Sequence, residues 1–342
     1  MELILSLVYK FPDSYFVATP KNEFVWKKDT AIIKGIYKDA IIKFDNFGAR
    51  STSDYTTKSS AILAIGGSTT ACYALDQPNT WTALLEQQLP EKYWVGNFGK
   101  LGNHSYHHVE QLKHILNYPD LPQVKTVVIL MGINDFSAAL INQNKYSTLS
   151  NYEINLTAFA HLPDSAMPWV RRLSITKLLK KSKNNFFSKF NPDTHGQLLQ
   201  EQSKKWREAK KIDLLPDLTK GLIVYEQNIL KLIEIAHQNK VNLLFISQPV
   251  LWHKTLSVED EKLLYSNKTD GGNYYSKKAL VEGIKLFNDR LEQTCLQTNT
   301  PFIQSNLAST SINFYDDCHF TEAGAKNLSE QVFEGLKSHQ LF

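Results

Sequence analysis

The chain has 342 residues, of which 42% are hydrophobic and 21% charged, with 15 glycines and 12 prolines. This composition is typical of a soluble globular protein with one large domain or two small ones. The formal net charge of +4 is too small to indicate binding to nucleic acid.

The first 60 residues are rich in aromatic side chains and contain no long periodic segment, so we expect an N-terminal extension that packs on the core. The apolar run at 3–8 is too short for the core of a signal peptide and far too short to cross a bilayer. The sequence KFDNFGARS at 43–51 predicts a turn formed by Asn46 and Gly48.

From residue 61 onward, short apolar runs alternate with segments of helical periodicity. The apolar runs are typical of buried strands because they are nearly continuous instead of alternating with polar residues. Strands are predicted within 61–70, where the apolar run ends in two glycines, and at 93–99, 125–135, 241–249 and 301–306. Helices are predicted at 81–89 with Thr80 as the cap, and at 105–116, 221–240, 278–298 and 323–338.

This alternation predicts a three-layer α/β/α sandwich with a doubly wound, mainly five-stranded parallel sheet. Residues 61–342 would form this domain. In such sheets the ligand site lies beyond the carboxyl ends of the strands, so the polar clusters that follow each strand are the candidates for chemistry.

A polar and basic segment at 136–220 is expected to be a mainly helical insertion, with short helices near 171–181 and 201–211. Between Arg171 and Lys220 there are 13 Lys or Arg and 5 Asp or Glu, a net charge of +8, which leaves −4 for the remainder. This insertion could contact a membrane or an anionic polymer, but a solvated helical face is the favoured interpretation.

The first strand leads into GGSTT at 66–70, where Ser68 either caps a helix or acts as a nucleophile at the helix N-terminus. The segment is not a Gly-x-Ser-x-Gly elbow, because residue 70 is threonine, and no Gly-Lys-Ser/Thr of a phosphate loop follows. The residues alone leave the two roles of Ser68 equally open.

Glycine and amide groups follow the next two strands. Gly102, in NFGKLG at 97–102, either permits a positive φ or brings a backbone N–H close to a ligand. Asn134, in GIND at 132–135, either forms an Asx turn or directs its amide at an oxyanion.

Near the C-terminus, YDDCHFTEAG at 315–324 places Asp316 three residues before His319. Thr321 could simply cap the last helix there. Alternatively, Asp316 holds His319 in one tautomer, so that the imidazole acts as a general base.

These four blocks, GGSTT, NFGKLG, GIND and DDCH, in this order after these elements, resemble the SGNH hydrolases, the GDSL-like esterase and lipase superfamily. The resemblance covers 61–135, 245–249 and 284–338, and it implies the flavodoxin-like fold of that superfamily.

The resemblance also implies roles for five residues. Ser68 would be the nucleophile, His319 the base and Asp316 its orienting partner. The oxyanion hole would consist of the Ser68 N–H, the Gly102 N–H and the Asn134 side chain.

One residue departs from the family pattern, because Gly67 replaces the aspartate of block one. The turn at 43–51 also resembles bacterial members that carry an N-terminal membrane anchor. This leaves open that the chain is the ectodomain of a longer protein, and its compartment stays open.

Other reactive side chains have structural interpretations. Histidines 104, 107, 108 and 114 cluster without a HExxH motif, so neither a metal nor another cofactor is expected. Tryptophans 94, 169, 206 and 252 are expected mainly in the core, although they could stack on sugar rings. Cysteines 72, 295 and 318 have no metal-ligand spacing, and Cys72 and Cys318 are expected as free thiols lining the site.

The first functional hypothesis is a serine ester hydrolase that removes a small acyl group, such as acetyl, from a carbohydrate or similar ester. The alternatives are an esterase of the lipase or lysophospholipase type, an O-acyltransferase to a sugar hydroxyl, and a non-catalytic binding protein with the same fold. The native substrate and the oligomeric state stay open.

Overall fold

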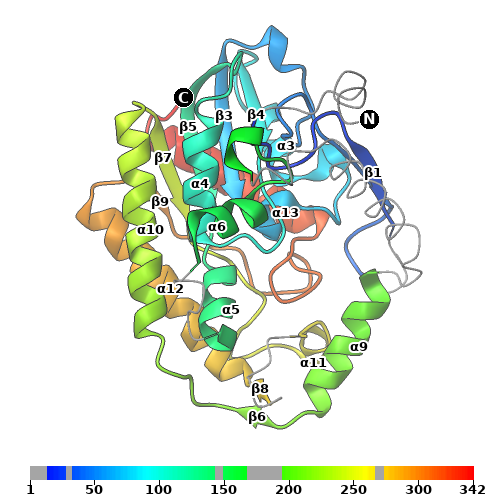
Figure 1. The fold of residues 1–342 in the computed structure, drawn as a ribbon. Helices are drawn as coiled ribbons and strands as arrows, with labels where there is room; N and C mark the ends of the chain where they lie inside the picture. Colours follow the sequence, from blue (N-terminus) through cyan, green and yellow to red (C-terminus); the bar gives the residue numbers. More distant parts are fainter. Residues whose placement is uncertain (1–13, 28–32, 143–148, 168–194, 266–272) are drawn as a thin grey trace, which may run out of the picture.

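Figure 1 shows the protein in a computed structural model, which describes residues 14–27, 33–142, 149–167, 195–265 and 273–342. A five-stranded parallel sheet forms its centre, with the strand order β4-β3-β5-β7-β9. The strands are β3 (Ser60–Gly66), β4 (Tyr93–Asn97), β5 (Gln123–Leu130), β7 (Asn242–Ile246) and β9 (Phe302–Ile303).

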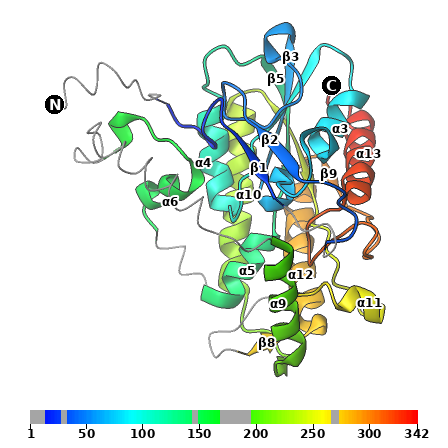
Figure 2. The same cartoon turned by 90° about the vertical axis from the view of Figure 1, so that its right-hand side faces the viewer.

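Helices cover both faces of this sheet, as the 90° view in Figure 2 shows. One face carries α4 (Ser105–Ile115), α10 (Thr219–Gln238) and α12 (Lys277–Gln297), and the other carries α3 (Trp81–Gln88) and α13 (Glu322–Ser338). All seven residues of β3 are buried, which explains the continuous apolar run at 61–65 within it. The predicted three-layer α/β/α sandwich is therefore confirmed.

Local sequence signals set the helix ends. Thr80 accepts a hydrogen bond from the Ala83 N–H (3.2 Å) and begins α3, as predicted. Thr321 does the same for α13 through the Gly324 N–H (3.0 Å). The short helices are α2 (Ser68–Ala71) and α11 (Val258–Glu261), with 3₁₀ turns at Tyr55–Thr57, Gln77–Asn79 and Asp164–Ala166.

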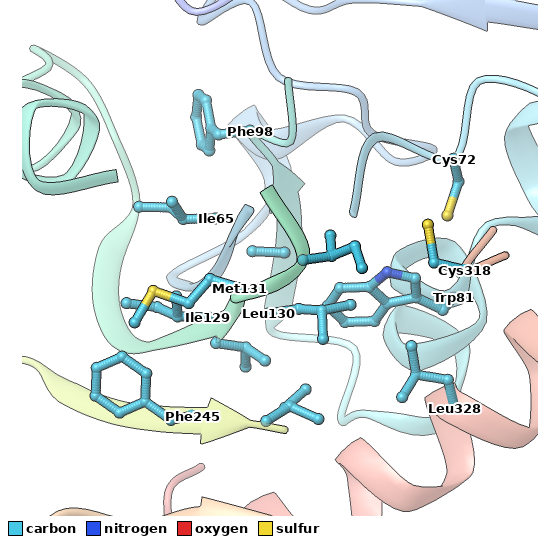
Figure 3. Close-up of a cluster of buried hydrophobic side chains, with 14 of the residues drawn as sticks. Ile65, Cys72, Trp81, Phe98, Ile129, Leu130, Met131, Phe245, Cys318 and Leu328 are labelled. Atoms are coloured by element: carbon cyan, nitrogen blue, oxygen red, sulfur yellow. The ribbon is translucent and has the colours of Figure 1, made fainter. Parts of the chain in front are cut away.

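The core lies between the sheet and its helices, and Figure 3 shows the part beneath the carboxyl ends of the strands. Ile129 and Leu130 of β5 are fully buried there, together with Trp81 of α3 and Leu328 of α13. The thiols of Cys72 and Cys318 point toward one another at the edge of this cluster. The segment before α3, which carries Cys72, therefore lies next to the segment before α13, which carries Cys318.

The N-terminal extension contains structure that the sequence did not indicate. Strand β1 (Glu23–Trp26) pairs antiparallel with β2 (Ala40–Lys43) in a separate two-stranded sheet. The turn at 43–51 exists, and Gly48 has a φ of +71°. Its side-chain acceptor is Asp45, which bonds the N–H groups of Phe47 (2.8 Å) and Ala49 (3.0 Å), whereas Asn46 bonds the Tyr55 hydroxyl (2.6 Å). Asn46 and Phe47 are the central residues of the turn that the Gly48 N–H closes on the Asp45 carbonyl (3.2 Å), so the predicted turn with Asn46 and Gly48 is confirmed.

The segment at 136–220 is mainly helical where the structure describes it. It contains most of α5 (Ile133–Asn142), then α6 (Asn151–Ala158) and α9 (His195–Glu208). Strand β6 (Lys211–Ile212) pairs parallel with β8 (Tyr274–Tyr275). The helix predicted near 171–181 and the most basic part of the segment lie outside the described residues.

Among the helices in the described ranges, none combines the length and the apolar character needed to cross a bilayer.

Candidate active site

The site lies at the carboxyl ends of β3, β4 and β5. Strand β3 is the point where the order of the sheet reverses, since β4 and β5 flank it on opposite sides. A parallel sheet has its ligand crevice at such a reversal. The loops after these strands carry Ser68, Gly102 and Asn134 in turn.

Ser68 is the first residue of α2, directly after Gly67, and its side chain is half-buried. Helix α2 is a single turn that ends at Cys72, whose φ of +50° lies in the left-handed region. A single turn contributes unbonded N–H groups, but only a small dipole. Negative charge that develops near Ser68 is therefore stabilised mainly by the unbonded N–H groups of this turn, and little by a helix dipole.

His319 bonds Ser68 and Asp316 through its two ring nitrogens. The Nε2 atom lies 2.8 Å from Ser68 Oγ, and the Nδ1 atom lies 2.8 Å from Asp316 Oδ2 and 3.0 Å from Oδ1. A base held by a carboxylate on one nitrogen and bonded to a hydroxyl on the other is the arrangement of a serine triad. The structure thus brings these three side chains together from opposite ends of the chain.

Asp316 is completely buried, and its loop supplies the donors that a buried carboxylate needs. Its Oδ1 accepts hydrogen bonds from the N–H groups of Cys318 (3.0 Å) and His319 (2.8 Å). Burial raises the pKa of Asp316, but the charge of His319 and these donors outweigh it and hold the pKa below its usual value.

The imidazole shows the complementary shift. Burial lowers the pKa of His319, whereas the adjacent Asp316 carboxylate raises it, and the net result is a pKa well above the usual value. The pair therefore favours an imidazolium next to a carboxylate, which is the charge state that follows proton transfer from a serine.

Asn134 lies beside Gly67 and bonds the residue that follows Gly102. The Asn134 amide donates one hydrogen bond to the Asn103 carbonyl (2.8 Å), and its Nδ2 lies 2.6 Å from where a Cβ on Gly67 would be. Gly102 has a φ of +74°, a backbone conformation that other residues rarely adopt, whereas a Cβ there would meet nothing within 4 Å. A glycine is therefore favoured here by the backbone conformation and not by a lack of room for a side chain.

A buried carboxylate ties the two loops together. Asp135 accepts hydrogen bonds from the Ser105 N–H (3.1 Å) and hydroxyl (2.6 Å), and this links the start of α4 to the residue after Asn134. Burial raises the pKa of Asp135 to about 7. Together with the bond from Asn134 to the Asn103 carbonyl, this contact fixes the segment of Gly102 relative to that of Asn134.

Comparison with known proteins identifies the family. The profile of the GDSL-like Lipase/Acylhydrolase family matches residues 62–332, which is most of the chain and includes all four blocks. This chain is a member of that family. No curated protein sequence matches it.

Solved structures similar to this acylhydrolase are distant. They include a putative lipolytic protein of the G-D-S-L family from Desulfitobacterium hafniense (12% identity, 81% of this chain and 99% of that chain, TM-score 0.42). They also include Est24, a carbohydrate acetylesterase from Sinorhizobium meliloti (13% identity, 83% of this chain and 100% of that chain, TM-score 0.43). At this distance they do not bear on the substrate of this chain.

The acylhydrolase has a cavity of about 210 Å³ above the candidate triad, with Ser68, Gly102 and His319 in its lining. Aromatic side chains form much of its wall, and the Tyr315 ring stacks on the His319 imidazole (5.7 Å between centroids, 14° between planes). The remaining lining residues are Trp26, Tyr73, Ala74, Leu101 and Tyr315.

Sequence reasoning missed these wall residues. Trp26 lies on β1 of the N-terminal hairpin, and its ring is 5.9 Å from that of Tyr73. Tyr315 was adjacent to the recognised DDCH block, which was the available signal. No pattern in residues 1–60 indicated that one of their side chains would reach the site.

The histidines near block two have structural roles. His107 Nδ1 accepts the His104 N–H (2.9 Å) at the start of α4, and its Nε2 bonds the Thr157 hydroxyl (2.7 Å). His114 stacks on Tyr15 with 3.6 Å between centroids. In the part of the chain that the structure describes, the one group of side chains with metal-ligand spacing is Asp316, Cys318 and His319, two of which belong to the candidate triad.

The other expectations concern tryptophans and thiols. Trp94, Trp206 and Trp252 are buried in the core, as expected, while Trp169 lies outside the described residues. Cys72 and Cys318 are buried free thiols, and Cys72 contributes to a small pocket beneath Ser68 and His319. Burial raises the pKa of Cys72 to about 11, so this thiol is uncharged at neutral pH.

Proposed function

We propose that this GDSL-like acylhydrolase is a serine esterase that acts through an acyl-enzyme at Ser68. The observation that carries the proposal is the pair of 2.8 Å contacts of His319, one to Ser68 Oγ and the other to Asp316 Oδ2. Hydrogen-bond distance between nucleophile and base, with a third group orienting the base, is the geometric signature of an activated serine.

In the proposed reaction, Ser68 Oγ attacks the ester carbonyl while His319 Nε2 takes the serine proton. The carbonyl oxygen becomes an oxyanion, and the Ser68 N–H, the Gly102 N–H and the Asn134 amide donate hydrogen bonds to it. His319 returns the proton to the departing alcohol. Water, deprotonated by His319, then releases the acid from Ser68.

The proposed substrate is an ester of a small acyl group, such as acetyl, on a carbohydrate or similar alcohol. The cavity of about 210 Å³ favours a short acyl group over a long lipid chain. Its aromatic walls at Trp26, Tyr73 and Tyr315 suit the apolar face of a sugar ring. Transfer of the acyl group to a sugar hydroxyl uses the same residues, and the product formed with added acceptor sugars separates it from hydrolysis.

The test is the hydrolysis of p-nitrophenyl acetate by the wild type and by Ser68→Ala. Loss of the nucleophile in a serine triad lowers kcat by about 10⁶, so the variant should be inactive at an unchanged melting temperature. A fluorophosphonate should label Ser68 stoichiometrically in the wild type. Full activity of Ser68→Ala, or labelling of a different serine, contradicts the proposal.

A further inference from the structure

Arg50 has an unusual environment, because its side chain is 2% exposed and its hydrogen-bond partners are mainly backbone carbonyls. It lies between β2 and β3, before the residues 62–332 that match the family profile. A buried guanidinium is costly unless its donors are satisfied, so its contacts indicate what it holds in place.

The guanidinium bonds the chain immediately after the candidate nucleophile. Its Nη1 donates to the carbonyls of Ala71 (2.9 Å) and Cys72 (2.8 Å), and its Nη2 donates to the carbonyl of Leu75 (2.6 Å). Its Nε donates to Gln77 Oε1 (2.8 Å). The planar fork of arginine therefore clamps the C-terminal end of α2 and the loop beyond it.

Charge supports this clamp. The carbonyls at the end of a helix turn have no partner within the helix and carry partial negative charge. Burial lowers the pKa of Arg50 to about 10, which still leaves the guanidinium protonated at neutral pH. The positive charge of Arg50 therefore lies against the carbonyls at the C-terminal end of α2 that have no partner within the helix.

The backbone of Arg50 is anchored to the sheet. Its N–H donates to the Asn97 carbonyl (2.8 Å), and its carbonyl accepts the Asn97 N–H (3.3 Å) at the end of β4. The Asn97 side chain in turn donates to the Thr70 carbonyl (2.7 Å). Three consecutive carbonyls, from residues 70 to 72, are thus held by a unit of Arg50 and Asn97 that is fixed to the sheet.

We propose that Arg50 is a positioning residue of this active site, which fixes α2 so that Ser68 Oγ stays within hydrogen-bond distance of His319. The inference rests on the proposed role of Ser68. Because α2 is one turn, a shift at Ala71 or Cys72 is transmitted directly to Ser68. A misplacement of about 1 Å in a catalytic group can lower a rate by about 10².

The test compares Arg50→Lys and Arg50→Gln with the wild type at temperatures where each is fully folded. Lysine keeps the charge but lacks the fork, and glutamine lacks both, so kcat should fall about 10-fold and about 100-fold. KM should change less than kcat, because Arg50 itself does not line the cavity. The rate of Ser68 modification by a fluorophosphonate should fall in parallel with kcat.

A matched control is Thr126→Val, which removes a buried hydrogen bond to the Leu341 carbonyl (2.5 Å) in the first half of β5. It should lower the melting temperature and leave kcat unchanged. Arg50 variants that melt early but turn over and label like the wild type overturn the inference, since Arg50 would then only stabilise the fold.

If the Arg50 variants do not fold, Gln77→Leu decides the question. It removes the acceptor of Nε, one of the four hydrogen bonds that fix the guanidinium, so the hold on α2 weakens and kcat should fall several-fold. A kcat equal to that of the wild type overturns the inference. If the wild type itself does not label at Ser68, the proposed function is refuted. If wild type and variant label at equal rates, only the role of Arg50 is refuted.

Discussion

At the scale of single residues, Asp316 and Asp317 are neighbours in the sequence but contact different parts of the molecule. Asp316 bonds the His319 imidazole (2.8 Å), whereas Asp317 accepts from the Trp252 indole (2.7 Å) and from the Tyr265 N–H (3.3 Å). Both are buried. The first therefore orients the proposed base, and the second ties the loop after β7 to the loop before α13.

The two aspartates should respond differently to replacement by asparagine. Asp316→Asn should lower kcat by up to about 10⁴, because the imidazole loses the carboxylate that selects its tautomer. Asp317→Asn should lower stability by about 1–3 kcal/mol through weakened hydrogen bonds and leave kcat of the folded enzyme nearly unchanged. Melting temperature and kcat of both variants check this, and an Asp316→Asn enzyme with normal turnover contradicts the proposed triad.

The activity should also depend on pH through His319, which must be neutral to accept the serine proton. Its pKa is raised well above the usual value, so kcat/KM should rise with pH and reach half its maximum above pH 6.5. The same shift stabilises the fold fully below the unfolded pKa, and this contribution is lost as pH rises through the folded pKa. In Asp316→Asn the midpoint of the kcat/KM profile should move to lower pH; an unmoved midpoint assigns the titration to another group.

Gly67 replaces the aspartate of the family pattern, and here it leaves room for the Asn134 amide. A Cβ at residue 67 would lie 2.6 Å from Asn134 Nδ2, well inside normal contact distance. Gly67→Ala should therefore displace the amide and lower kcat by about 10²–10³, as loss of one oxyanion donor does. In an Asn134→Ala background the same change should have almost no further effect, because the displaced group is already absent. Additive losses in the double variant contradict this explanation.

At the scale of elements, the β1–β2 hairpin forms part of the cavity wall although it precedes the region matched by the family profile. Phe24 and Phe44 of this segment pack edge-on against Tyr73, which itself lines the cavity beside Trp26. The hairpin is therefore placed to limit the size of the bound ester.

Trp26→Ala should enlarge the cavity and shift selectivity toward longer acyl chains. The ratio of kcat/KM for p-nitrophenyl hexanoate to that for the acetate should rise by about 15- to 60-fold, since two or three buried CH₂ groups are worth roughly 1.6–2.4 kcal/mol. Val25→Ala on the exposed side of the same strand is the matched control and should leave the ratio unchanged. An unchanged ratio in both variants places the acyl group elsewhere.

At the scale of the whole molecule, the sheet could be predicted because its strands are buried on both faces and read as continuous apolar runs. The rule that strand ends gather at one edge predicted that Ser68 and Asn134 lie near each other. His319 lies well beyond the end of β9, and its place beside Ser68 was implied by the resemblance to the SGNH hydrolases. The hairpin could not be predicted in this way. Its strands have four residues each, and their pairing depends on contacts with Tyr73 and the turn at Asp45.

The helices α5 and α6 were also missed, for a related reason. Helix α5 begins inside block three, at Ile133, and its first turn carries the polar Asn134 and Asp135, which are equally typical of a turn after a strand. Helix α6 starts with a capping box, in which Ser150 and Glu153 bond each other's backbone N–H. That local signal was present in the sequence, whereas the clamp of Arg50 on α2 was not visible without the fold.

The contact between Ser68 and His319 joins residues that are 251 positions apart. Bringing such distant segments together has an entropy cost that later contacts must offset, and folds dominated by these pairings form slowly. Every strand of the central sheet lies between the two residues in the chain or begins just before Ser68. Recovery of ester hydrolysis after dilution from denaturant would therefore follow closure of the complete chain, later than the signals of helix formation and collapse.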